Sequence, residues 1–409
     1  MIEDIKFQRE IDFQKSPIGK IPKDWEVAKL ANVSERIKGR KPTMLLNEKT
    51  GNSQPYLIAE YMRSNSNIQW CKNDDPKIVR VDQKELIMIW DGSYSGDVFV
   101  GFEGVLASTM VKIMPAENLD RNFLYYFLKT KFKFLRGTTS GTGIPHVSKS
   151  IFENLLIPLP SVKEQRAVVG VLGVVDSAIG LVDRVIQKTE RLKKGLMQTL
   201  LTRGIGHKEY EQTPIGKKPK EWNVVALGDI CNQRNEMFQP SGKNDYRFVG
   251  LEHIASGETR MRTHAQDIAV KSSKFRFYSG DILYGKLRPY LDKAVLVDFD
   301  GICSTDLLVL KPQDEVLKEF LVYVLHFKEF LKHAVATTSG TNHPRTSWTA
   351  ISKFRFGLPK PEEQKRIAET LLAVDKKLEV EKIEKAKLER IKQGLMDLLL
   401  TGKVRVKVD

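Results

Sequence analysis

The amino-acid sequence predicts an α+β protein in which two pseudo-symmetric α/β domains are separated by two long helices that form an antiparallel coiled coil. Two observations lead to this fold class. The chain of 409 residues repeats its own motifs in the same order, and each repeat ends in a long stretch of helical periodicity. PIGKIPKDWEV at residues 17–27 returns as PIGKKPKEWNV at 214–224, and ERLKKGLM at 190–197 returns as ERIKQGLM at 389–396. Two copies with so long a period indicate a duplicated domain rather than a solenoid, whose units span about 20 to 50 residues.

Each repeat opens with a globular region that mixes strand and helix signals. Short apolar runs bounded by glycine at residues 105–108 and 282–284 predict strands. Apolar residues three and four positions apart at residues 122–134 and 316–330 predict amphipathic helices. A mixed sheet-and-helix domain is therefore expected in each half.

The two halves also differ in a defined place. Residues 33–104 align poorly with residues 230–301, although matching sequence flanks both segments. One structural frame is therefore expected to carry two different inserts. The predicted blocks are a first domain at residues 1–159, a first spacer helix at 160–205, a second domain at 206–358, and a second spacer helix with the C-terminal tail at 359–409.

The first spacer helix has recognisable ends. Ser161 and Glu164 have the spacing of a capping box, which satisfies free amide groups at a helix N-terminus, and Gly204 is a typical helix stop. Between these ends, apolar residues recur with the heptad spacing of a coiled coil. The candidate contact residues are Val168, Val175, Val182, Leu192 and Leu196.

The second copy supplies a partner helix. Pro361 suits a first helical turn, and Gly402 is the predicted stop. The segment 381–387 is polar enough to interrupt the apolar seam. If a pseudo-dyad relates the copies, the helices pack antiparallel; alternatively, each pairs with a separate protein, but the apolar content of the first helix favours the intramolecular pair. The candidate contact residues on the second helix are Ile367, Val374, Leu388 and Leu395.

Charge indicates the class of partner. The net charge is +15, and both globular regions share the excess: residues 1–160 hold 23 Lys and Arg against 19 Asp and Glu, and residues 205–360 hold 23 against 18. A surplus on each domain favours binding of a polyanion at two places, although a merely basic protein has the same composition. The acidic N-terminus does not resemble a secretory signal, and no apolar run is long enough to span a membrane, so a cytoplasmic protein is expected.

No catalytic or metal-binding motif in the sequence is complete. Residues 280–287 approach a phosphate-binding loop, but Leu287 stands where a hydroxyl residue would hold magnesium. Residues 92–96 have Tyr94 where a nucleophile elbow needs serine. The histidines and the three cysteines have no metal-ligand spacing. We expect no catalytic residue and no metal site in this chain.

Polar loops remain as candidates for contacts to DNA. Small hydroxyl residues beside glycine present donors to phosphate without steric obstruction, although the same pattern also suits a plain turn before a helix. The candidates in the first half are Thr138, Thr139, Ser140, His146, Ser148 and Lys149. The candidates in the second half are Thr337, Thr338, Ser339, Asn342, His343 and Arg345.

A second pair of loops occupies matching positions in the two halves. Lys286, Arg288 and Tyr290 place two basic residues and an aromatic ring on a short loop, where arginine can reach guanine edges. The counterpart in the first half offers Ser93 and Tyr94 instead, so the two domains are expected to read different bases. Arg36, Lys38 and Lys41 form a further basic cluster, for which a solvated face is the alternative interpretation.

The doubled order of these motifs resembles the specificity subunit of Type I restriction-modification systems. The resemblance spans the whole chain and is carried by the Trp25 and Trp222 motifs, the Leu-Pro-x-x-x-x-Gln start of each helix, the Gly-Leu-Met close, and Lys286 to Tyr290. It implies two target-recognition domains, each binding one half of a bipartite, asymmetric site in double-stranded DNA. It also implies that two methyltransferase subunits dock on the helices and that motor-nuclease subunits join the complex. S-adenosylmethionine, ATP and magnesium then belong to those partners, and this chain has no cofactor and is not an enzyme.

Two other functions fit the duplicated architecture. A self-sufficient DNA-modifying enzyme would need a methyl-donor or metal site and would turn over substrate alone. A two-headed protein-binding scaffold would show no steep loss of DNA affinity with added salt.

Overall fold

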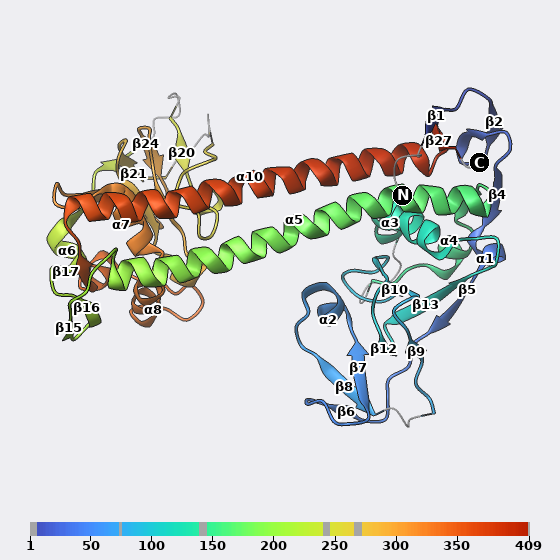
Figure 1. The fold of residues 1–409 in the computed structure, drawn as a ribbon, viewed down its shortest axis with the longest axis horizontal. Coiled ribbons are helices and arrows are strands. Elements are labelled where there is room, and N and C mark those ends of the chain that lie inside the picture. The colour runs from blue at the N-terminus through green and yellow to red at the C-terminus, as the bar shows by residue number, and fades with distance from the viewer. Residues whose placement is uncertain (1–5, 73–75, 139–144, 240–245, 266–271, 408–409) are drawn as a thin grey trace. The chain divides into compact units, whose positions relative to one another are not determined.

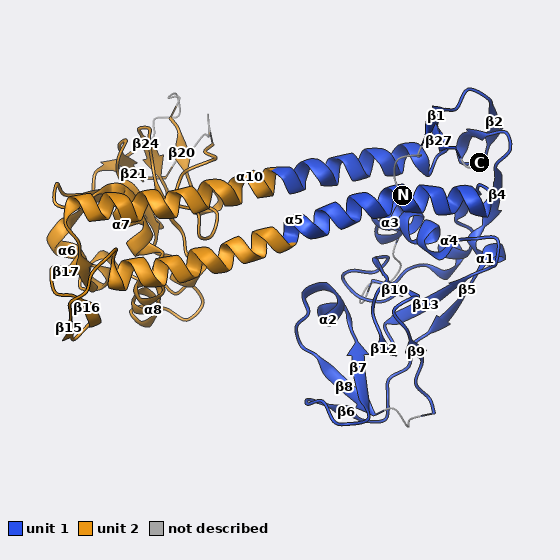
Figure 2. Ribbon diagram, in the orientation of Figure 1, with its two compact units in different colours: residues 1–183, 384–409 blue, residues 184–383 orange. Residues whose placement is uncertain are grey.

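The computed structural model describes residues 6–72, 76–138, 145–239, 246–265 and 272–407. The chain divides into two compact units, residues 1–183 with 384–409 and residues 184–383 (Figure 2). Each unit contains a globular head and the adjoining halves of two long helices, α5 (Val162–Arg203) and α10 (Pro361–Leu399). The first head precedes α5 in the chain, and the second head lies between α5 and α10.

The first head contains two larger sheets. Its main sheet has the order β11-β10-β13-β5 and its second sheet the order β6-β8-β7-β12-β9. Neighbouring strands are antiparallel except β12 and β7, which run parallel. These strands are β5 (Ser34–Lys38), β6 (Leu45–Leu46), β7 (Ser53–Leu57), β8 (Gln69–Lys72), β9 (Arg80–Val81), β10 (Leu86–Ile89), β11 (Val98–Phe99), β12 (Gly104–Leu106) and β13 (Met110–Pro115).

The second head repeats the main sheet and changes the second one. Its main sheet has the order β23-β22-β25-β18, which is the strand order of the first head again, whereas its second sheet has four strands in the order β19-β21-β24-β20. These strands are β18 (Cys231–Arg234), β19 (Met237–Phe238), β20 (Phe248–Val249), β21 (Lys274–Phe277), β22 (Ile282–Gly285), β23 (Ala294–Leu296), β24 (Gly301–Cys303) and β25 (Leu307–Pro312). The two poorly alignable segments, 33–104 and 230–301, build most of the second sheets but also three of the four strands of each main sheet. The boundary between matching and divergent sequence therefore does not coincide with the boundary between the two sheets.

Short strand pairs and helices complete the heads. The antiparallel pairs are β1 (Phe7–Arg9) with β27 (Val404–Val406), β2 (Phe13–Ser16) with β3 (Gly19–Pro22), β4 (Glu26–Lys29) with β14 (Leu156–Leu159), β15 (Tyr210–Thr213) with β16 (Gly216–Pro219), and β17 (Asn223–Ala226) with β26 (Arg355–Leu358). The helices of the heads are α1 (Leu30–Val33), α2 (Ala59–Ser64), α3 (Arg121–Gly137), α4 (Lys149–Glu153), α6 (Leu227–Ile230), η1 (Leu251–His253), η2 (Pro289–Leu291), α7 (Lys318–Leu325), α8 (Lys328–Ala336) and α9 (Trp348–Ile351).

The helix expected at residues 316–330 is broken. It consists of α7 and α8, and Phe327 between them has the extended conformation of an N-cap. The buried side chain of His326 explains the break: its ring nitrogens lie 2.7 Å from Asp292 Oδ1 and 2.8 Å from the Ala294 carbonyl oxygen. Periodicity alone gives no sign of this interruption.

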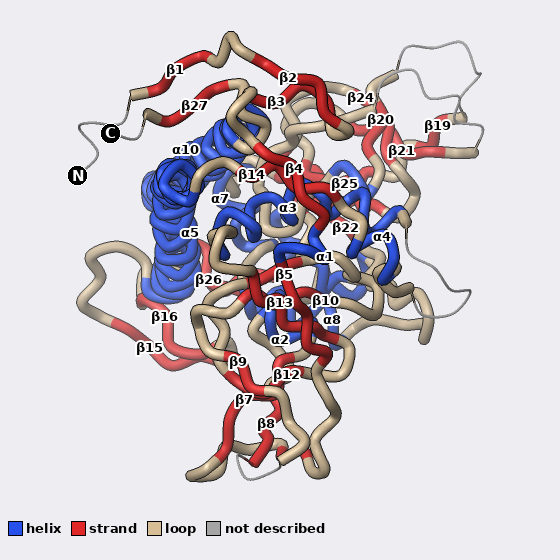
Figure 3. The backbone as a smooth tube through the Cα atoms, turned by 90° about the vertical axis from the view of Figure 1, so that its right-hand side faces the viewer, coloured by secondary structure: helices blue, strands red, loops and turns tan. Residues whose placement is uncertain are grey.

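The long helices run antiparallel within each unit, as the sequence predicts. In the first unit, buried residues near the start of α5 (Val168, Leu172) share an apolar cluster with Met396 and Leu399 near the end of α10. In the second unit, Met197 near the end of α5 shares a cluster with the start of α10, where the buried contact residues are Ile367, Ala368 and Leu371. Figures 1 and 3 show the two helices side by side.

The heptad prediction is wrong at one position and incomplete at others. Leu192 is 54% exposed, whereas Met197 is buried, because an α-helix repeats every 3.6 residues and drifts from a strict heptad. The remaining candidates are only half-buried, namely Val175, Val182, Leu196, Val374, Leu388 and Leu395. The apolar seam is therefore strongest next to each head.

Twin polar contacts join the helices to each other and to the heads. In the first unit, Asp176 of α5 lies 2.6 Å from Lys392 Nζ of α10 and accepts a 2.7 Å hydrogen bond from Tyr126 Oη of α3. In the second unit, Asp375 of α10 lies 2.5 Å from Lys193 Nζ of α5 and accepts a 2.9 Å hydrogen bond from Tyr323 Oη. Burial and the neighbouring carboxylate raise the pKa of both tyrosines, which keeps their hydroxyls protonated as donors.

A carboxylate anchors the start of each long helix, and it is buried in the first unit and half-buried in the second. Glu164 accepts a 3.1 Å hydrogen bond from Trp25 Nε1, and Glu363 accepts a 2.9 Å bond from Trp222 Nε1. Only half of the predicted capping box forms: Ser161 Oγ accepts from the Glu164 amide at 3.3 Å, while the Glu164 carboxylate is used by the head. The next residue in each helix, Gln165 or Gln364, bonds two backbone carbonyls of the same unit, and both glutamines are fully buried.

The chain ends complete the anchor of the first unit. Strand β27 pairs with β1, and Arg405 on β27 binds Glu164 at 2.7 Å, Glu10 at 2.8 Å and Asp24 at 2.8 Å. The hydrogen bond to Glu164 raises the pKa of the Arg405 guanidinium, and the bond from Arg405 lowers the pKa of Asp24. In the second unit His207 occupies the equivalent place, with Nε2 2.8 Å from Glu363 Oε1.

A segment of the second insert crosses onto the long helices, and we call residues 255–262 the helix strap. The Gly257 carbonyl accepts from Lys193 of α5 at 3.2 Å, Thr259 Oγ1 donates to Asp375 of α10 at 3.2 Å, and Arg262 pairs with Glu379 at 3.1 Å.

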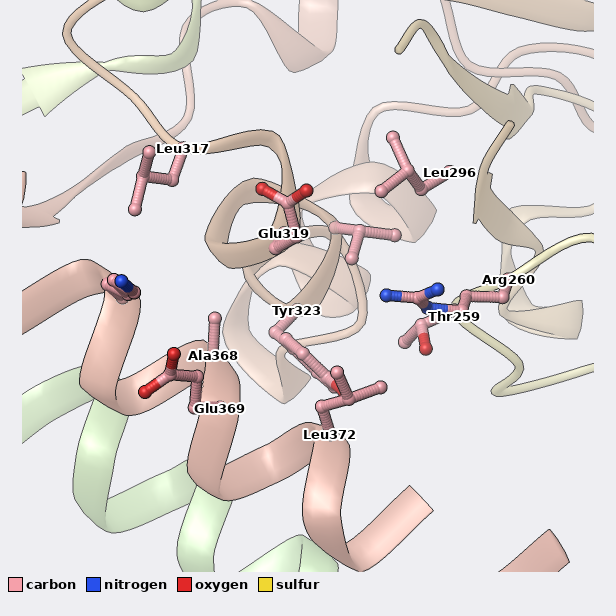
Figure 4. Close-up of a pocket in the computed structure, with 11 residues that line it drawn as sticks. Thr259, Arg260, Leu296, Leu317, Glu319, Tyr323, Ala368, Glu369 and Leu372 are labelled. Carbon is pink, nitrogen blue, oxygen red and sulfur yellow. The ribbon is translucent and has the colours of Figure 1, made fainter. Parts of the chain in front are cut away.

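A cavity of about 320 Å³ lies beside the strap, between α7 and α10 (Figure 4). The residues labelled around it in Figure 4 include Thr259, Arg260, Glu319, Tyr323, Glu369 and Leu372.

No helix within the described ranges is long and apolar enough to cross a membrane.

Glu164→Gln should lower the free energy of unfolding of the first unit by about 2 kcal/mol, since hydrogen bonds to a charged acceptor contribute about 1.5 to 3 kcal/mol. The measurement is urea unfolding followed by NMR of fluorine-labelled Trp25, whose indole donates to Glu164. Glu117→Gln, at an exposed position of the same unit, is the control. Equal unfolding midpoints for both variants would contradict the anchoring role.

Asp375→Asn should release the helix strap, because it weakens contacts to Lys193, Tyr323 and Thr259 at once. We expect hydrogen exchange at the amide of Leu296, which donates to the Thr259 carbonyl, to accelerate about tenfold or more. Asp176→Asn removes the equivalent carboxylate of the first unit and should leave exchange in the strap unchanged. Acceleration of the strap by both variants would show that the two carboxylates do not act locally.

Candidate DNA-recognition surface

Two loops of the second head are tied together by backbone hydrogen bonds. The first follows β22 and contains Lys286, Arg288 and Tyr290; the second precedes α9. The Arg288 amide donates to the Pro344 carbonyl at 2.7 Å, and the Thr346 amide donates to the Lys286 carbonyl at 3.0 Å. The structure thus brings together candidates that lie more than fifty residues apart in the sequence.

The tied loops display their side chains outward. Arg288 is exposed and has φ +49°, a left-handed conformation that is uncommon for a residue with a β-carbon. Tyr290 in the short helix η2 is 54% exposed, and Asn342 and His343 are exposed on the second loop. A strained backbone held by cross-loop bonds fixes where these donors point, which favours an arrangement prepared for a ligand.

Arg345 is held in place on the same surface. Its guanidinium binds Asp306 through Nε at 2.8 Å and Nη2 at 3.4 Å, and its backbone exchanges two 2.9 Å hydrogen bonds with Ser339. Asp306 was not predicted from the sequence as a site residue. The one signal in the sequence is its position in the turn just before β25, a strand of the main sheet. Because Asp306 neutralises part of its charge, Arg345 is a weaker candidate for phosphate than Arg288.

The first head builds the same pair of loops from different residues. The Gly92 amide donates to the Pro145 carbonyl at 2.7 Å, the Val147 amide donates to the Trp90 carbonyl at 2.9 Å, and Asp91 forms a β-bridge with His146. Ser93 and Tyr94 are exposed at the tip of this loop, and Tyr94 is 41% exposed. The two heads therefore present chemically different side chains from one position of the shared frame.

Basic residues beside the exposed loop of the first head are paired with carboxylates. Arg63, which the sequence did not single out, places its guanidinium 3.7 Å from the centroid of the Tyr94 ring and binds Asp97 at 2.7 Å. Lys38 pairs with Asp91 at 3.0 Å but keeps a side chain that is half exposed. No local pattern reveals Arg63, because it lies 31 positions before the ring it contacts.

Other basic candidates of the first head differ in accessibility. Arg36 is turned inward: Nη2 binds Glu153 at 3.0 Å, and the guanidinium lies over the Trp90 ring. Lys41 and Lys149 are exposed, and Lys149 is only loosely paired, 3.8 Å from Glu153. Within the predicted basic cluster, Lys38 and Lys41 therefore stay accessible to a ligand, whereas Arg36 does not; Lys149, a candidate of the hydroxyl loop, is accessible as well.

Several hydroxyl candidates are used inside their own helices. Thr138 Oγ1 donates to the Phe134 carbonyl at 3.1 Å, Thr337 Oγ1 to the His333 carbonyl at 2.9 Å, and Thr338 Oγ1 to the Val335 carbonyl at 2.8 Å. Ser148 caps α4 by accepting from the Ile151 amide at 3.5 Å. The structure favours the alternative interpretation of these four as helix-end residues. Thr139 and Ser140 lie outside the described residues.

Metal-binding clusters and reactive thiols are two kinds of group that would indicate catalysis. No cluster of three His, Cys, Asp or Glu side chains in the part of the chain that the structure describes could hold a metal ion. The three cysteines are buried, and burial raises the pKa of both Cys231 and Cys303 to about 12, far from the range of a nucleophilic thiolate.

Comparisons with known proteins identify one family along most or all of the chain. The family model described as "Type I restriction modification DNA specificity domain" matches twice, at residues 22–191 and 219–390. The Type I restriction enzyme MjaVIII specificity subunit of Methanocaldococcus jannaschii is 33% identical over 422 residues and is aligned over 100% of this chain and 99% of its own length. The EcoDI specificity subunit of Escherichia coli is 22% identical over 375 residues, covering 85% of this chain and 81% of that protein.

Solved structures show the same fold. The S subunit of a Type I restriction-modification system from M. genitalium superposes with a TM-score of 0.57 at 16% identity, covering 92% of this chain and 96% of that chain. A chain from a structure of complex assembly and conformational transition of the type I R-M system gives a TM-score of 0.54 at 19% identity, covering 94% and 99%. The resemblance stated from the sequence is thereby confirmed, and the protein belongs to the family of type I restriction-modification DNA specificity subunits.

Proposed function

We propose that this chain is the non-catalytic DNA-recognition subunit of a Type I restriction-modification complex and that each head binds one half of a bipartite, asymmetric DNA site. One observation carries the proposal: the same pair of tied loops recurs in both heads and exposes Ser93 and Tyr94 in the first but Arg288 and Tyr290 in the second. A shared frame with unlike donors suits two unlike sequences on one duplex.

The distribution of charge supports DNA as the ligand. Each globular region carries a surplus of basic residues, and exposed lysines and arginines accompany the loops in both heads. Arginine donors can read guanine edges, and lysines bind phosphate as point charges. A complex that acts on chromosomal DNA would work in the cytoplasm of its cell.

The long helices are proposed as the docking surface for two methyltransferase subunits, which motor-nuclease subunits would join. Apolar side chains remain exposed on both helices in each unit. They include Val174, Leu181, Ile391 and Leu398 in the first unit and Leu192, Val380 and Ile383 in the second. Apolar side chains left uncovered on two long helices suit burial against partner subunits. On this proposal S-adenosylmethionine, ATP and magnesium are held by the partners.

Arg288→Ala should reduce discrimination at one base pair of the second half-site by about 1 to 3 kcal/mol, since a bidentate arginine-guanine contact carries that much specificity. The measurement is binding of the assembled complex to a library of DNA duplexes randomised at each position. Tyr94→Ala is the matched variant in the first head and should change only the first half-site. An equal loss of affinity for every sequence after Arg288→Ala would assign the side chain to phosphate.

Lengthening both helices by one heptad should increase the preferred gap between the half-sites by about three base pairs. Seven residues add about 10 Å of helix, and one turn of DNA, about 10 base pairs, spans about 34 Å. Insertions after Asp183 in α5 and after Ile383 in α10 leave the contacts within each unit intact. The gap is read from methylation of a library with variable spacers, and an unchanged gap with unchanged half-sites would refute the role of helix length.

Two measurements distinguish the alternative functions: the salt dependence of DNA affinity and methyl transfer by the isolated chain. DNA affinity that falls steeply with salt is expected of a DNA-binding subunit and not of a protein scaffold. Methyl transfer by the isolated chain would restore the self-sufficient enzyme as an explanation.

A further inference from the structure

The second sheet of the second head contains a cleft that no sequence motif marks. It has a volume of about 220 Å³ and lies in the insert where the two halves of the chain diverge. Its lining residues come from the segments around β20, β21 and β24: Tyr246, Arg247, Arg276, Phe277, Tyr278, Asp300, Gly301 and Ile302. This volume is below the range of about 300 to 1,000 Å³ that is typical of small-molecule sites, so a single chemical group is a better fit than a free metabolite.

Aromatic rings hold the arginines of this region in fixed orientations. The Arg276 guanidinium lies 4.5 Å from the centroid of Phe238 and is loosely paired with Glu236, its Nε 3.7 Å from Oε1, and Arg247 lies 5.0 Å from the centroid of Phe299. Phe238 in turn contacts the Tyr246 ring edge to face, with centroids 4.7 Å apart. A stacked guanidinium keeps its planar fork of donors oriented, so little additional freedom is lost when it forms a bidentate contact.

Strand geometry forms the cleft between these side chains. Arg276 of β21 pairs with Ile302 of β24, and the Ile302 amide donates to the Arg247 carbonyl at 3.0 Å. Gly301 permits this approach, because a β-carbon there would lie 2.5 Å from the Arg247 carbonyl oxygen and 2.6 Å from the Phe277 ring. The positions of the two arginines are thus set by the backbone of the sheet.

The mixture of donors and acceptor favours a base edge over a phosphate. Asp300 lines the cleft beside the arginines, and its Oδ1 accepts from the Ser279 amide at 2.8 Å. A carboxylate repels phosphate but accepts from the amino groups of cytosine or adenine, while arginine donates to guanine O6 and N7. A site with both signs of hydrogen-bonding group suits a base pair in the major groove.

The cleft lies within reach of the tied loops. Asp306 contacts both tied loops, because its carbonyl accepts from the Lys286 amide at 3.0 Å and its carboxylate binds Arg345. Asp300 lies six residues before it, which spans at most about 20 Å of extended chain. That distance corresponds to about six base pairs of DNA, given about 34 Å for each turn of about 10 pairs. The cleft and the loops of Arg288 can therefore address a single half-site.

We propose that this cleft reads a base pair of the second half-site, with Arg276 and Arg247 as donors and Asp300 as an acceptor. The proposal rests on the proposed function of the second head and adds specificity-determining residues to it. It also gives a reason for the difference between the second sheets of the two heads, because on this proposal the second sheet adds base-reading side chains to those of the tied loops.

The test uses the complete complex and a duplex library randomised across both half-sites. Arg276→Ala should relax discrimination at one position of the second half-site by about 5- to 150-fold and leave the first half-site unchanged. Arg276→Lys keeps the charge but removes the fork, so it should lose discrimination while retaining affinity at low salt. Arg355→Ala, at an exposed arginine of β26 in the same unit, is the matched control and should behave as the unmodified chain.

Two further variants make the result independent of the folding of Arg276→Ala. Arg247→Ala, at an exposed position, and Asp300→Asn should each change the preferred base at the same or an adjacent position. The proposal would be overturned if none of the three substitutions, at Arg276, Arg247 and Asp300, changed the base preference. A uniform loss of affinity across the library would also overturn it, because that result would indicate phosphate contact. If the unmodified complex itself shows no two-part preference, the proposed function fails instead.

Discussion

The hydrogen bond from a buried tryptophan to a glutamate at the start of each long helix is the interaction on which the architecture depends. Glu164 and Glu363 accept from Trp25 and Trp222, so each head is fixed to its helix through a carboxylate that is buried in the first unit and half-buried in the second. A buried carboxylate is stable only when its lone pairs are satisfied. Arg405 supplies that satisfaction in the first unit and His207 in the second, which links the chain ends to the first anchor.

This anchoring separates rigid and variable parts of each head. Main sheets with identical strand order, twin Asp-Tyr-Lys contacts and fully buried glutamines recur in both units, whereas the second sheets differ in strand number and composition. The exposed loops also differ, with Ser93 and Tyr94 in the first head and Arg288 and Tyr290 in the second. The molecule thus keeps the geometry of presentation constant while the presented chemistry changes.

The sequence predicted most of the frame because duplication is visible as repeated motifs and helices are visible as periodicity. Pro361 and Gly402 marked helix ends correctly, and the half-formed capping box at Ser161 is an instance in which a tertiary contact took over a local one. The prediction for Leu192 was wrong because a strict heptad drifts from the 3.6-residue repeat of the helix, which places Met197 rather than Leu192 in the buried seam. Arg63, Asp306 and Arg276 act through neighbours distant in sequence, so no spacing rule could identify them.

The helix strap has a consequence for how such genes can recombine. Replacement of residues 230–301 by the corresponding segment of another gene would also replace the groups that meet Lys193, Asp375 and Glu379, so a functional hybrid needs an incoming segment that matches these helix residues. In the first unit, Asp176 is bound by Tyr126 and Lys392, which both lie outside residues 33–104. An exchange in the first half thus leaves the polar contacts of Asp176 in place, whereas an exchange in the second half has to restore those of the helix strap.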